Sequence, residues 1–349
     1  MQTFQSPAHF GGRAFLYDAA MRELALLEHI YAQSGNLGRR VIVGPGDDMA
    51  VLRLAGSDLL IAVDQIADGV HFDSACDSLD RIGRKAVTRN LSDVAAMAAV
   101  PVAAVASAML PRTLGEDKAQ QLFNAMQAVG RAYDCPLVGG DVGMWEQPLQ
   151  ISVTVLAEPG HVAPVLRSTA KPGDIVFVSG HLGNAWPPTP PTSAPTVSPT
   201  GAGDTPNHAA DFEPRLALAH ALAQRLGPAL HSMIDLSDGL GSDLQRICEQ
   251  SHVQAMLDVS HLPLRQAARP RPDLHAPWEA ALYDGEDYEL CFTVAPEAAA
   301  DLPDTLADVP LARVGKIVAA GSGATGKVQL TLPDGRVQSP SRGGWEHQG

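Results

Sequence analysis

The hydrophobic residues of this chain follow two periods, one typical of helices and one typical of strands. Apolar side chains recur every three or four positions over residues 19–34, 80–99, 115–133 and 214–226, which predicts four helices. The helix at 80–99 is alanine-rich in its second half, apart from Asn90, Ser92 and Asp93. Asn90 and Asp93 are three positions apart and share a face. If Asp93 is buried there it needs a cation, and the alternative is that it faces solvent.

Short apolar runs between these helices predict strands, and several of them lead into acidic residues. The runs at 41–43 and 136–138 precede glycine-containing turns, the run at 59–63 ends at an aspartate, and Met233-Ile234 opens a turn before a further helix. The acidic segments are Gly46-Asp47-Asp48, Asp64, Gly139-Gly140-Asp141 and Asp235-Leu236-Ser237-Asp238-Gly239. A helix N-terminus at such a turn suits a phosphate. The alternative is that these side chains only cap helices or end strands in solvent.

The remaining strands and a change in composition predict two domains. Residues 149–156 alternate cleanly, as in a half-exposed strand, and residues 175–178 begin a new sheet. We place the boundary near 160–173, which gives an N-terminal domain at 15–160 and a C-terminal domain at 161–349. Residues 187–207 consist mainly of Pro, Thr, Ser and Gly, which predicts an extended insertion within the second domain.

Charge and cysteine content narrow the class of protein. The 349 residues include 39 acidic and 25 basic ones, for a formal net charge of -14. Such a surface repels nucleic acid and anionic membranes, so we expect neither as a partner. The four cysteines show no CxxC spacing, which argues against a zinc site or a disulfide framework. Residues 1–13 lack the apolar core of a secretory signal, and no uncharged apolar stretch reaches spanning length, so we expect a cytoplasmic protein.

If the acidic segments converge in the fold, they require cations. Two carboxylates about 4 Å apart repel by roughly 4 kcal/mol at an effective dielectric constant of about 20. Carboxylate ligands select Mg²⁺, Mn²⁺ or Ca²⁺, and bound Mg²⁺ usually completes its coordination with substrate phosphates. The sequence has no GxxxxGK[ST], GxSxG or HExxH motif, and no GxGxxG follows a predicted strand. The residues therefore indicate a metal-dependent enzyme that acts on phosphate esters or nucleotides.

Seven ordered motifs resemble those of the thiamine-monophosphate kinase family, within the superfamily of aminoimidazole ribonucleotide synthetase. The resemblance covers about residues 20–347 and leaves 187–207 as an unmatched insertion. The motifs are Gly46-Asp47-Asp48; Val63-Asp64 with Gly69-Val70-His71-Phe72; Lys85-Ala86 with Asn90-Leu91-Ser92-Asp93-Val94-Ala95-Ala96-Met97; Gly139-Gly140-Asp141; Arg167-Ser168 with Lys171-Pro172-Gly173-Asp174; Ile234-Asp235-Leu236-Ser237-Asp238-Gly239-Leu240; and Gly285-Glu286-Asp287-Tyr288-Glu289-Leu290.

The resemblance implies a fold and a reaction. The fold is α+β with two domains, an N-terminal α/β domain whose sheet joins its copy in a homodimer and a C-terminal α/β sandwich. The reaction transfers the terminal phosphoryl group of ATP to thiamine monophosphate, giving thiamine diphosphate. Several Mg²⁺ ions are implied, with a monovalent cation as a further candidate. The acceptor oxygen is already ionised near neutral pH, so no general base is expected and catalysis reduces to alignment and charge neutralisation.

Carried over by motif position, the implied site residues fall into three groups. The metal ligands are Asp48, Asp64, Asp93, Asp141, Asp235 and Asp238. The ATP contacts are Gly140, Asp141, Arg167 and Ser237. The residues on the substrate side are His71, Glu286 and Trp345. Trp345 comes from the terminal Gly344-Trp345-Glu346-His347, which resembles the family's closing Gly-aromatic-Asp-His segment.

Two departures from the family pattern keep alternatives open. Ala62-Val63 stands where the family usually has a hydroxyl residue before the Asp matched by Asp64, and Val142-Gly143-Met144 replaces a hydroxyl- and arginine-bearing run. One alternative is a divergent superfamily member that phosphorylates or activates another substrate with ATP. The other is a nucleotide-binding paralogue without catalysis. An assay with ATP, Mg²⁺ and thiamine monophosphate distinguishes the three.

Overall fold

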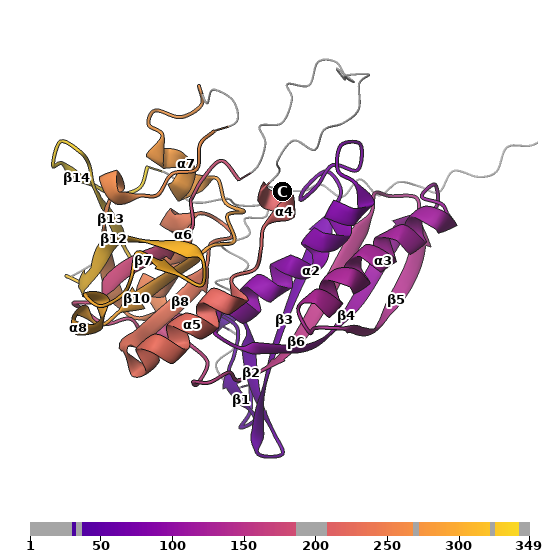
Figure 1. Cartoon of the computed structure of the whole chain (residues 1–349), viewed down its shortest axis with the longest axis horizontal. Helices are drawn as coiled ribbons and strands as arrows, with labels where there is room; N and C mark the ends of the chain where they lie inside the picture. Colours follow the sequence, from indigo (N-terminus) through magenta and orange to yellow (C-terminus); the bar gives the residue numbers. More distant parts are fainter. Residues whose placement is uncertain (1–29, 33–36, 186–207, 268–271, 322–324, 342–349) are drawn as a thin grey trace, which may run out of the picture.

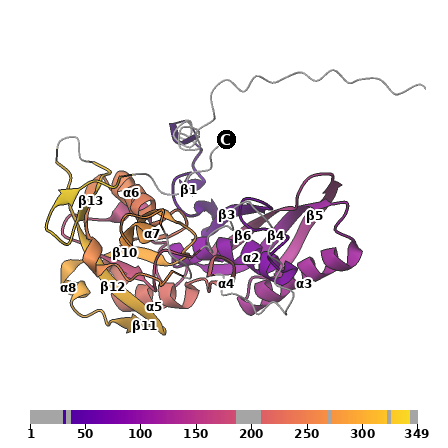
Figure 2. The same ribbon diagram turned by 90° about the horizontal axis from the view of Figure 1, so that it is seen from above.

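Two sheets, one in each half of the chain, organise the structure. The computed structural model describes residues 30–32, 37–185, 208–267, 272–321 and 325–341. Trp345, the insertion at 187–207 and most of the helix predicted at 19–34 lie outside the described residues. We call the part built on strands β1 to β6 the N-lobe and the part built on β7 to β14 the C-lobe. The two lobes lie side by side (Figures 1 and 2).

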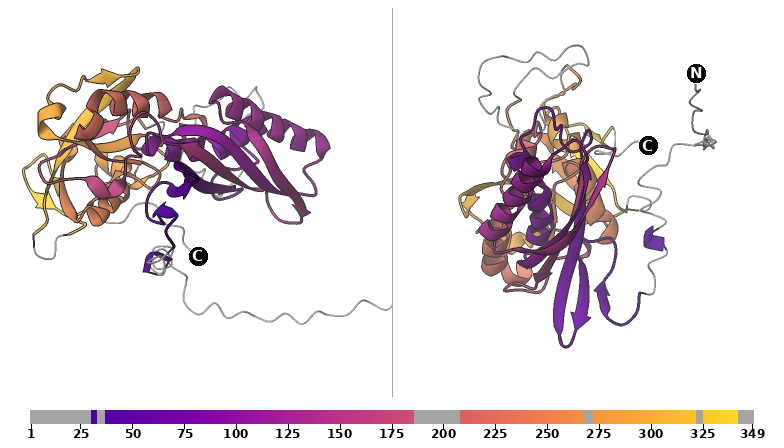
Figure 3. Two further views of the ribbon diagram at one scale, coloured as in Figure 1. Left: turned by 90° about the horizontal axis from the view of Figure 1, so that it is seen from below. Right: turned by 90° about the vertical axis from the view of Figure 1, so that its right-hand side faces the viewer.

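The N-lobe sheet has the strand order β1-β2-β3-β6-β4-β5. Only the pair β4 and β5 is parallel among its described neighbours. Helices α2 and α3 lie together over one face (Figures 1 and 3), which confirms the helices predicted at 80–99 and 115–133. The elements are β1 (Val41–Val43), β2 (Ala50–Leu54), β3 (Ser57–Ala67), α2 (Leu79–Ala96), β4 (Val100–Pro111), α3 (Glu116–Ala132), β5 (Leu137–Trp145) and β6 (Gln150–Glu158).

Helix α2 holds the N-lobe together. Ser78 caps it by accepting a hydrogen bond from the amide of Arg81 at 3.3 Å. The second half of α2 carries mostly small side chains and is buried against the sheet, because alanine allows the helix to approach the strands closely. Asn90 is an unfavourable residue inside a helix, but both ends of its amide are used. It donates to the carbonyl of Ala86 at 3.1 Å and accepts from the backbone amide of Asp64 at 3.1 Å, which ties α2 to β3.

Two acidic segments that we predicted at strand ends lie inside strands instead. Asp64 is followed by three more residues of β3, because Gln65, Ile66 and Ala67 continue the ladder with β6. Gly140-Asp141 lies in the middle of β5, where residues 137–145 pair with β4. The predictions were wrong at these two places because polar or glycine residues were read as strand breaks, whereas long-range pairing overrides local preference.

The N-lobe sheet has one face that no described element covers. Register places Val63, Thr154 and Val105 side by side on it, and Ser107 opposite Asp141 on the same face. The side chains on the other face of β6, such as Val153, are buried under α2. Val63 is 62% exposed and Val105 37% exposed, so the open face presents aliphatic groups to solvent.

The C-lobe sheet has the order β14-β13-β9-β12-β7-β10-β8, with the short β11 on β12. Its pairs are antiparallel except β13 with β9. The turn sequence Pro333-Asp334-Gly335 between residues 327–332 and Val337 predicts a hairpin, which the pair of β13 and β14 confirms. The strands are β7 (Ile175–Ser179), β8 (Leu230–Asp235), β9 (Val253–Asp258), β10 (Leu290–Val294), β11 (Thr305–Leu306), β12 (Val309–Ala319), β13 (Val328–Thr331) and β14 (Val337–Gln338). The helices are α4 (His208–Asp211), α5 (Leu216–Leu226), α6 (Leu240–Gln250), α7 (Trp278–Tyr283) and α8 (Pro296–Ala299), with 3₁₀ turns η1 (Arg167–Thr169), η2 (Gly227–Ala229) and η3 (Val259–His261).

Both faces of the central C-lobe strands are buried. Phe177 and Phe292 stack with ring centroids 5.5 Å apart on the face that α5 covers. Val178 and Cys291 lie on the other face, in a second core beneath α6. The first core is continuous with the N-lobe core through α2 and α5, so one apolar interior joins the lobes.

The sequence analysis missed two short helices, α4 and α7, and predicted too long a helix at α8. A proline in the first turn and Pro303 past the end predict a helix at 296–302, whereas α8 ends at Ala299. Helices of four to six residues show too little periodicity to be distinguished from loops. Over the described segments, no helix combines the length and apolar character needed to cross a bilayer.

Candidate metal and phosphate site

Three carboxylates from distant parts of the sequence meet where the lobes join. Asp48 follows the turn after β1, Asp93 lies on α2 and Asp235 ends β8. One oxygen from each lies within 4.8 Å of the others. We call these three residues the carboxylate cluster. The structure thus brings together three of the predicted metal ligands, from both lobes.

The cluster is costly to keep charged without a cation. Burial raises the pKa of Asp93 well above its ordinary value, and the negative charges of Asp64, Asp235 and Asp48 raise it further. Burial, followed by the charge of Asp48, likewise raises the pKa of Asp235. Ser92 opposes the shift of Asp235, since its hydroxyl donates to Oδ2 at 2.6 Å. An all-oxygen group of this kind suits a hard divalent cation.

Arg167, expected to contact ATP, holds the acidic turn in place. Its Nη2 and Nε donate to the two oxygens of Asp48 at 2.6 and 3.0 Å, and its Nη1 donates to the carbonyl of Gly46 at 3.0 Å. Its backbone amide donates to Asp47 Oδ2 at 3.1 Å. Burial and the adjacent Asp48 raise the pKa of Asp47 to about 7. Arg167 therefore balances part of the negative charge on this turn.

The predicted substrate-side residues His71 and Glu286 are linked by a buried lysine. Lys85 Nζ donates to the backbone carbonyl of His71 at 2.6 Å and pairs with Glu286 Oε2. Glu286 has φ +58° in the turn before β10, and its amide donates to the carbonyl of Ser237 at 2.8 Å. Tyr288 donates to Glu286 Oε1 at 3.2 Å. Burial lowers the pKa of Lys85, an effect that Glu286 opposes.

Asp64 lies beside the cluster, and a second cation contacts it. Its charge is the second-largest cause of the raised pKa of Asp93, after burial. Arg89 Nε lies 3.3 Å from Asp64 Oδ2, and Arg89 Nη1 lies 3.9 Å from Glu286 Oε1. Sequence reasoning gave neither Lys85 nor Arg89 a role. The sequence feature that could have identified them is their spacing: Lys85, Arg89 and Asp93 follow one another at intervals of four residues and so share one face of α2.

Asp238 faces a different set of partners. Its Oδ2 pairs with Arg246, and its amide donates to Asp243 Oδ2 at 3.0 Å. Burial and Asp238 raise the pKa of Asp243 to about 7. Gly239 has φ +99° before α6, and a Cβ there would lie 2.6 Å from the carbonyl oxygen of Leu282, so the turn requires glycine. Asp238 follows Asp235 by three residues, but its carboxylate pairs with Arg246 and is not one of the three in the carboxylate cluster.

Asp141 lies away from the cluster within this chain. Strand β5 is the edge of the sheet, three strand spacings from β3, which is roughly 14 Å. Asp141 faces the open side of the sheet, opposite α2, whereas Gly140 shares the face of Asp64. A Cβ on Gly140 would lie 1.8 Å from the carbonyl oxygen of Ala106, so this position admits only glycine without rearrangement.

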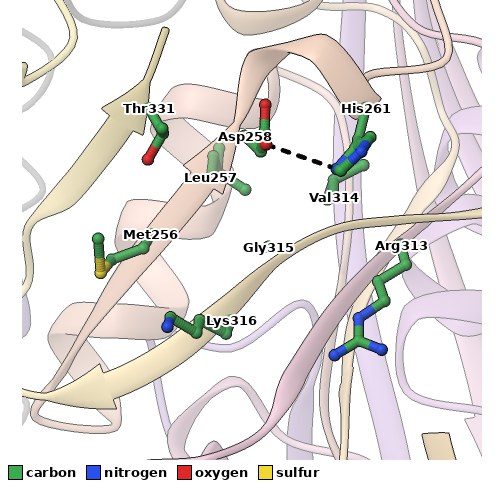
Figure 4. Close-up of a pocket in the computed structure, with 9 residues that line it drawn as sticks. All are labelled: Met256, Leu257, Asp258, His261, Arg313, Val314, Gly315, Lys316 and Thr331. Carbon is green, nitrogen blue, oxygen red and sulfur yellow. Dashed lines mark ion pairs between the residues drawn. The ribbon is translucent and has the colours of Figure 1, made fainter. Parts of the chain in front are cut away.

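A hollow in the C-lobe is separate from this site. It lies on β9, β12 and β13 and is lined by side chains that include Asp258, His261, Arg313 and Lys316 (Figure 4). The cluster residue Asp235 is on β8, at the opposite edge of the sheet. Figure 4 shows the pair of Asp258 and His261, whose closest atoms are 3.7 Å apart.

Comparison with known proteins gives the class of protein to which the two lobes belong. Residues 46–158 match the family of the AIR synthase related protein, N-terminal domain, and residues 171–327 match its C-terminal domain. The crystal structure of a HypE-HypF complex shares this fold, with a TM-score of 0.69 and 19% identity over 91% of this chain and 99% of that one. The predicted two-domain architecture is confirmed.

Full-length relatives then give the family within that class. The chain is 36% identical to a thiamine-monophosphate kinase of Rhodopirellula baltica, over 85% of this chain and 92% of the relative. It is 34% identical to that of Bacillus subtilis, over 74% and 79%. The chain belongs to the thiamine-monophosphate kinase family, as its motifs predicted.

Two solved structures agree with this assignment. One is described as AaThiL complexed with AMPPCP and TMP; it has a TM-score of 0.71 and 25% identity and covers 93% of this chain and 97% of that one. The other is the thiamine-monophosphate kinase of Stenotrophomonas maltophilia K279a, with a TM-score of 0.63 and 30% identity over 91% and 98%.

Proposed function

We propose that this protein transfers the terminal phosphoryl group of ATP to thiamine monophosphate, forming thiamine diphosphate. Its family membership supports the reaction, and the single structural observation that carries it is the convergence of Asp48, Asp93 and Asp235 between the lobes. The relative described with AMPPCP and TMP supports the pairing of a nucleotide with a second phosphorylated ligand.

The residues present fit a site for Mg²⁺. The three clustered carboxylates have crowded oxygens and raised pKa values, which a divalent cation would relieve. We assign the cluster as the central ligands and propose Asp64 and Asp238 as further ones, in their predicted roles. When bound, the metal supplies charge neutralisation for the polyphosphate.

The chain's own residues supply alignment. We propose that Arg167 and Ser237 contact ATP from the two sides of the cluster, and that His71, Glu286 and Trp345 line the acceptor side. Since a phosphate oxygen is the nucleophile and is already ionised, none of these residues has to remove a proton.

We further propose that a homodimer completes the site. The open N-lobe face exposes aliphatic side chains such as Val63, which a second copy would bury. Asp141 and Gly140, proposed as metal and ATP contacts, lie on the edge strand of the same sheet. Because Asp141 faces away from its own cluster, we assign it to the site of the partner copy.

Mixing two inactive variants tests this arrangement. Asp93→Asn and Asp141→Asn are each expected to lose activity, and if they serve different copies, co-refolded mixtures regain part of it. A mixture that stays inactive while forming mixed dimers would overturn the assignment of Asp141 to the partner.

The reaction itself is tested by incubating the purified protein with ATP, Mg²⁺ and thiamine monophosphate and measuring thiamine diphosphate. Asp235→Asn should lower kcat about 1,000-fold, the scale of a lost charge-stabilising group. The matched control is Asp334→Asn, in an exposed turn of the C-lobe. ADP formation only with another acceptor would favour a divergent superfamily member, and nucleotide binding without turnover would favour a paralogue without catalysis.

A further inference from the structure

Arg89 lies between the carboxylate cluster and the acceptor side of the site. On α2 it is four residues after Lys85 and four before Asp93, so the three side chains share one face. Lys85 pairs with Glu286, and Asp93 belongs to the cluster. Arg89 is thus at the junction where the phosphate of an acceptor held by Glu286 would have to meet the metal ligands.

The guanidinium of Arg89 is buried but incompletely bonded. Its side chain is 13% exposed, and its Nε has no hydrogen-bond partner among the residues that the structure describes. Its nearest acceptors are Asp64 at 3.3 Å, the carbonyl of Gln65 at 3.5 Å and Glu286 at 3.9 Å. Charge-assisted bonds between such groups are normally about 2.7–2.9 Å.

The other cations beside the site are held more tightly. Arg167 makes two bonds to Asp48 at 2.6 and 3.0 Å. Arg246 pairs with Asp238 at 2.5 Å and with Asp243 at 3.1 Å. An arginine whose donors are buried and poorly paired is a group prepared for an anion, because it can turn toward phosphate without first breaking a short ion pair.

We propose that Arg89 binds the phosphate of the acceptor and selects a phosphorylated acceptor over the same molecule without phosphate. This inference rests on the proposed function, since it takes thiamine monophosphate as that acceptor. The planar guanidinium matches two phosphate oxygens at once and remains protonated at every physiological pH.

A purely structural role makes a different prediction. If Arg89 only bridges Asp64 of the N-lobe and Glu286 of the C-lobe, its loss disturbs every acceptor-side ligand alike. If it binds phosphate, its loss weakens thiamine monophosphate and leaves thiamine unaffected, because thiamine has no phosphate.

Calorimetric titration distinguishes these two roles. The full-length protein, in the presence of Mg²⁺ and AMPPCP, is titrated with thiamine monophosphate and separately with thiamine. In Arg89→Met we expect the Kd for thiamine monophosphate to rise at least tenfold and the Kd for thiamine to change less than twofold. Arg89→Lys should be intermediate, because it keeps the charge but not the two-pronged geometry. The control is Arg84→Met on another face of α2, where Arg84 pairs with the exposed Glu213. Equal weakening of both ligands, or of neither, would overturn the proposal.

Two further measurements keep the result decisive. If Arg89→Met does not fold, Arg89→Lys carries the test through kinetics, with a raised KM for thiamine monophosphate and an unchanged KM for ATP as the expected outcome. If the wild-type protein does not phosphorylate thiamine monophosphate, the proposed function fails by itself. Inorganic phosphate is then the probe for Arg89: weaker binding to Arg89→Lys than to wild type supports a phosphate site, and equal binding refutes it.

Discussion

The sheets of the two lobes differ in how much of their surface the chain itself covers. In the C-lobe, α5 and α6 bury opposite faces, and every residue of β7 and β10 is buried. In the N-lobe, α2 and α3 cover one face, and Val63 and Val105 remain exposed on the other. The C-lobe sheet is therefore a completed core, whereas the N-lobe sheet combines a core with a surface available for assembly.

The strongest test of this difference between the sheets introduces the same charge into both of them. Val178→Asp puts a carboxylate into the C-lobe core, and we expect it to cost more than about 4 kcal/mol of unfolding free energy or to prevent folding. Val105→Asp lies on the open face, and we expect a folded chain that no longer dimerises. Denaturant titration and light scattering measure the two effects.

Val105→Thr is the isosteric control for the second variant and should retain the dimer. A wild-type protein that is monomeric at micromolar concentration, or a Val105→Asp variant that keeps its dimer, would show that the open face serves another purpose.

A smaller effect distinguishes two adjacent glycines of β5. Gly140→Ala forces a methyl group against the carbonyl oxygen of Ala106, 1.8 Å away, and should destabilise the protein by about 1–3 kcal/mol. Gly139→Ala meets only the Val105 side chain at 3.8 Å, so its effect should stay below about 1 kcal/mol. Equal melting temperatures for the two variants would contradict the close approach of β4 and β5.

A further effect concerns pH and arises where the lobes meet. The folded pKa values of Asp47, Asp93 and Asp235 are raised, so the folded state retains protons that the unfolded chain releases above its ordinary carboxyl pKa of about 4. Stability in the absence of metal should therefore fall as pH rises from about 4 through about 7. Denaturation at pH 5 and pH 8 measures this fall.

Mg²⁺ should reverse the loss at pH 8, and Asp93→Asn should reduce it. A ligand-free protein that becomes more stable as pH rises over this range would contradict the crowding of the cluster.

The sequence predicted where the helices and the acidic segments lie along the chain. It did not predict which acidic side chains come together in the fold. Residues 80–99 predicted α2 because the pattern is long and local, and the polar spot at Asn90 and Asp93 proved to be real. The spacing of residues in the sequence could not predict that Asp48 lies close to Asp235, because their proximity depends on how the two lobes pack. Asp64 and Asp141 were placed at strand ends because ladder partners far along the chain are invisible locally.

The sequence analysis also assigned no role to two cationic residues beside the site. Lys85 and Arg89 were recognisable as charged residues on a largely buried helix, but their partners belong to β3 and to the turn before β10. Only the fold shows that Arg89 faces Asp64 and Glu286 together. Arg167 was predicted from its motif to contact ATP, and that role stays a prediction; the structure shows that it holds the acidic turn through Asp48.

The continuous core through α2 and α5 also limits how this protein can move. Swinging the lobes apart like a hinge would expose shared apolar surface, at about 25 cal/mol for each Å². We therefore expect ligands to enter and leave through local loop motion, with the spacing between the carboxylate cluster and Glu286 fixed by the shared core.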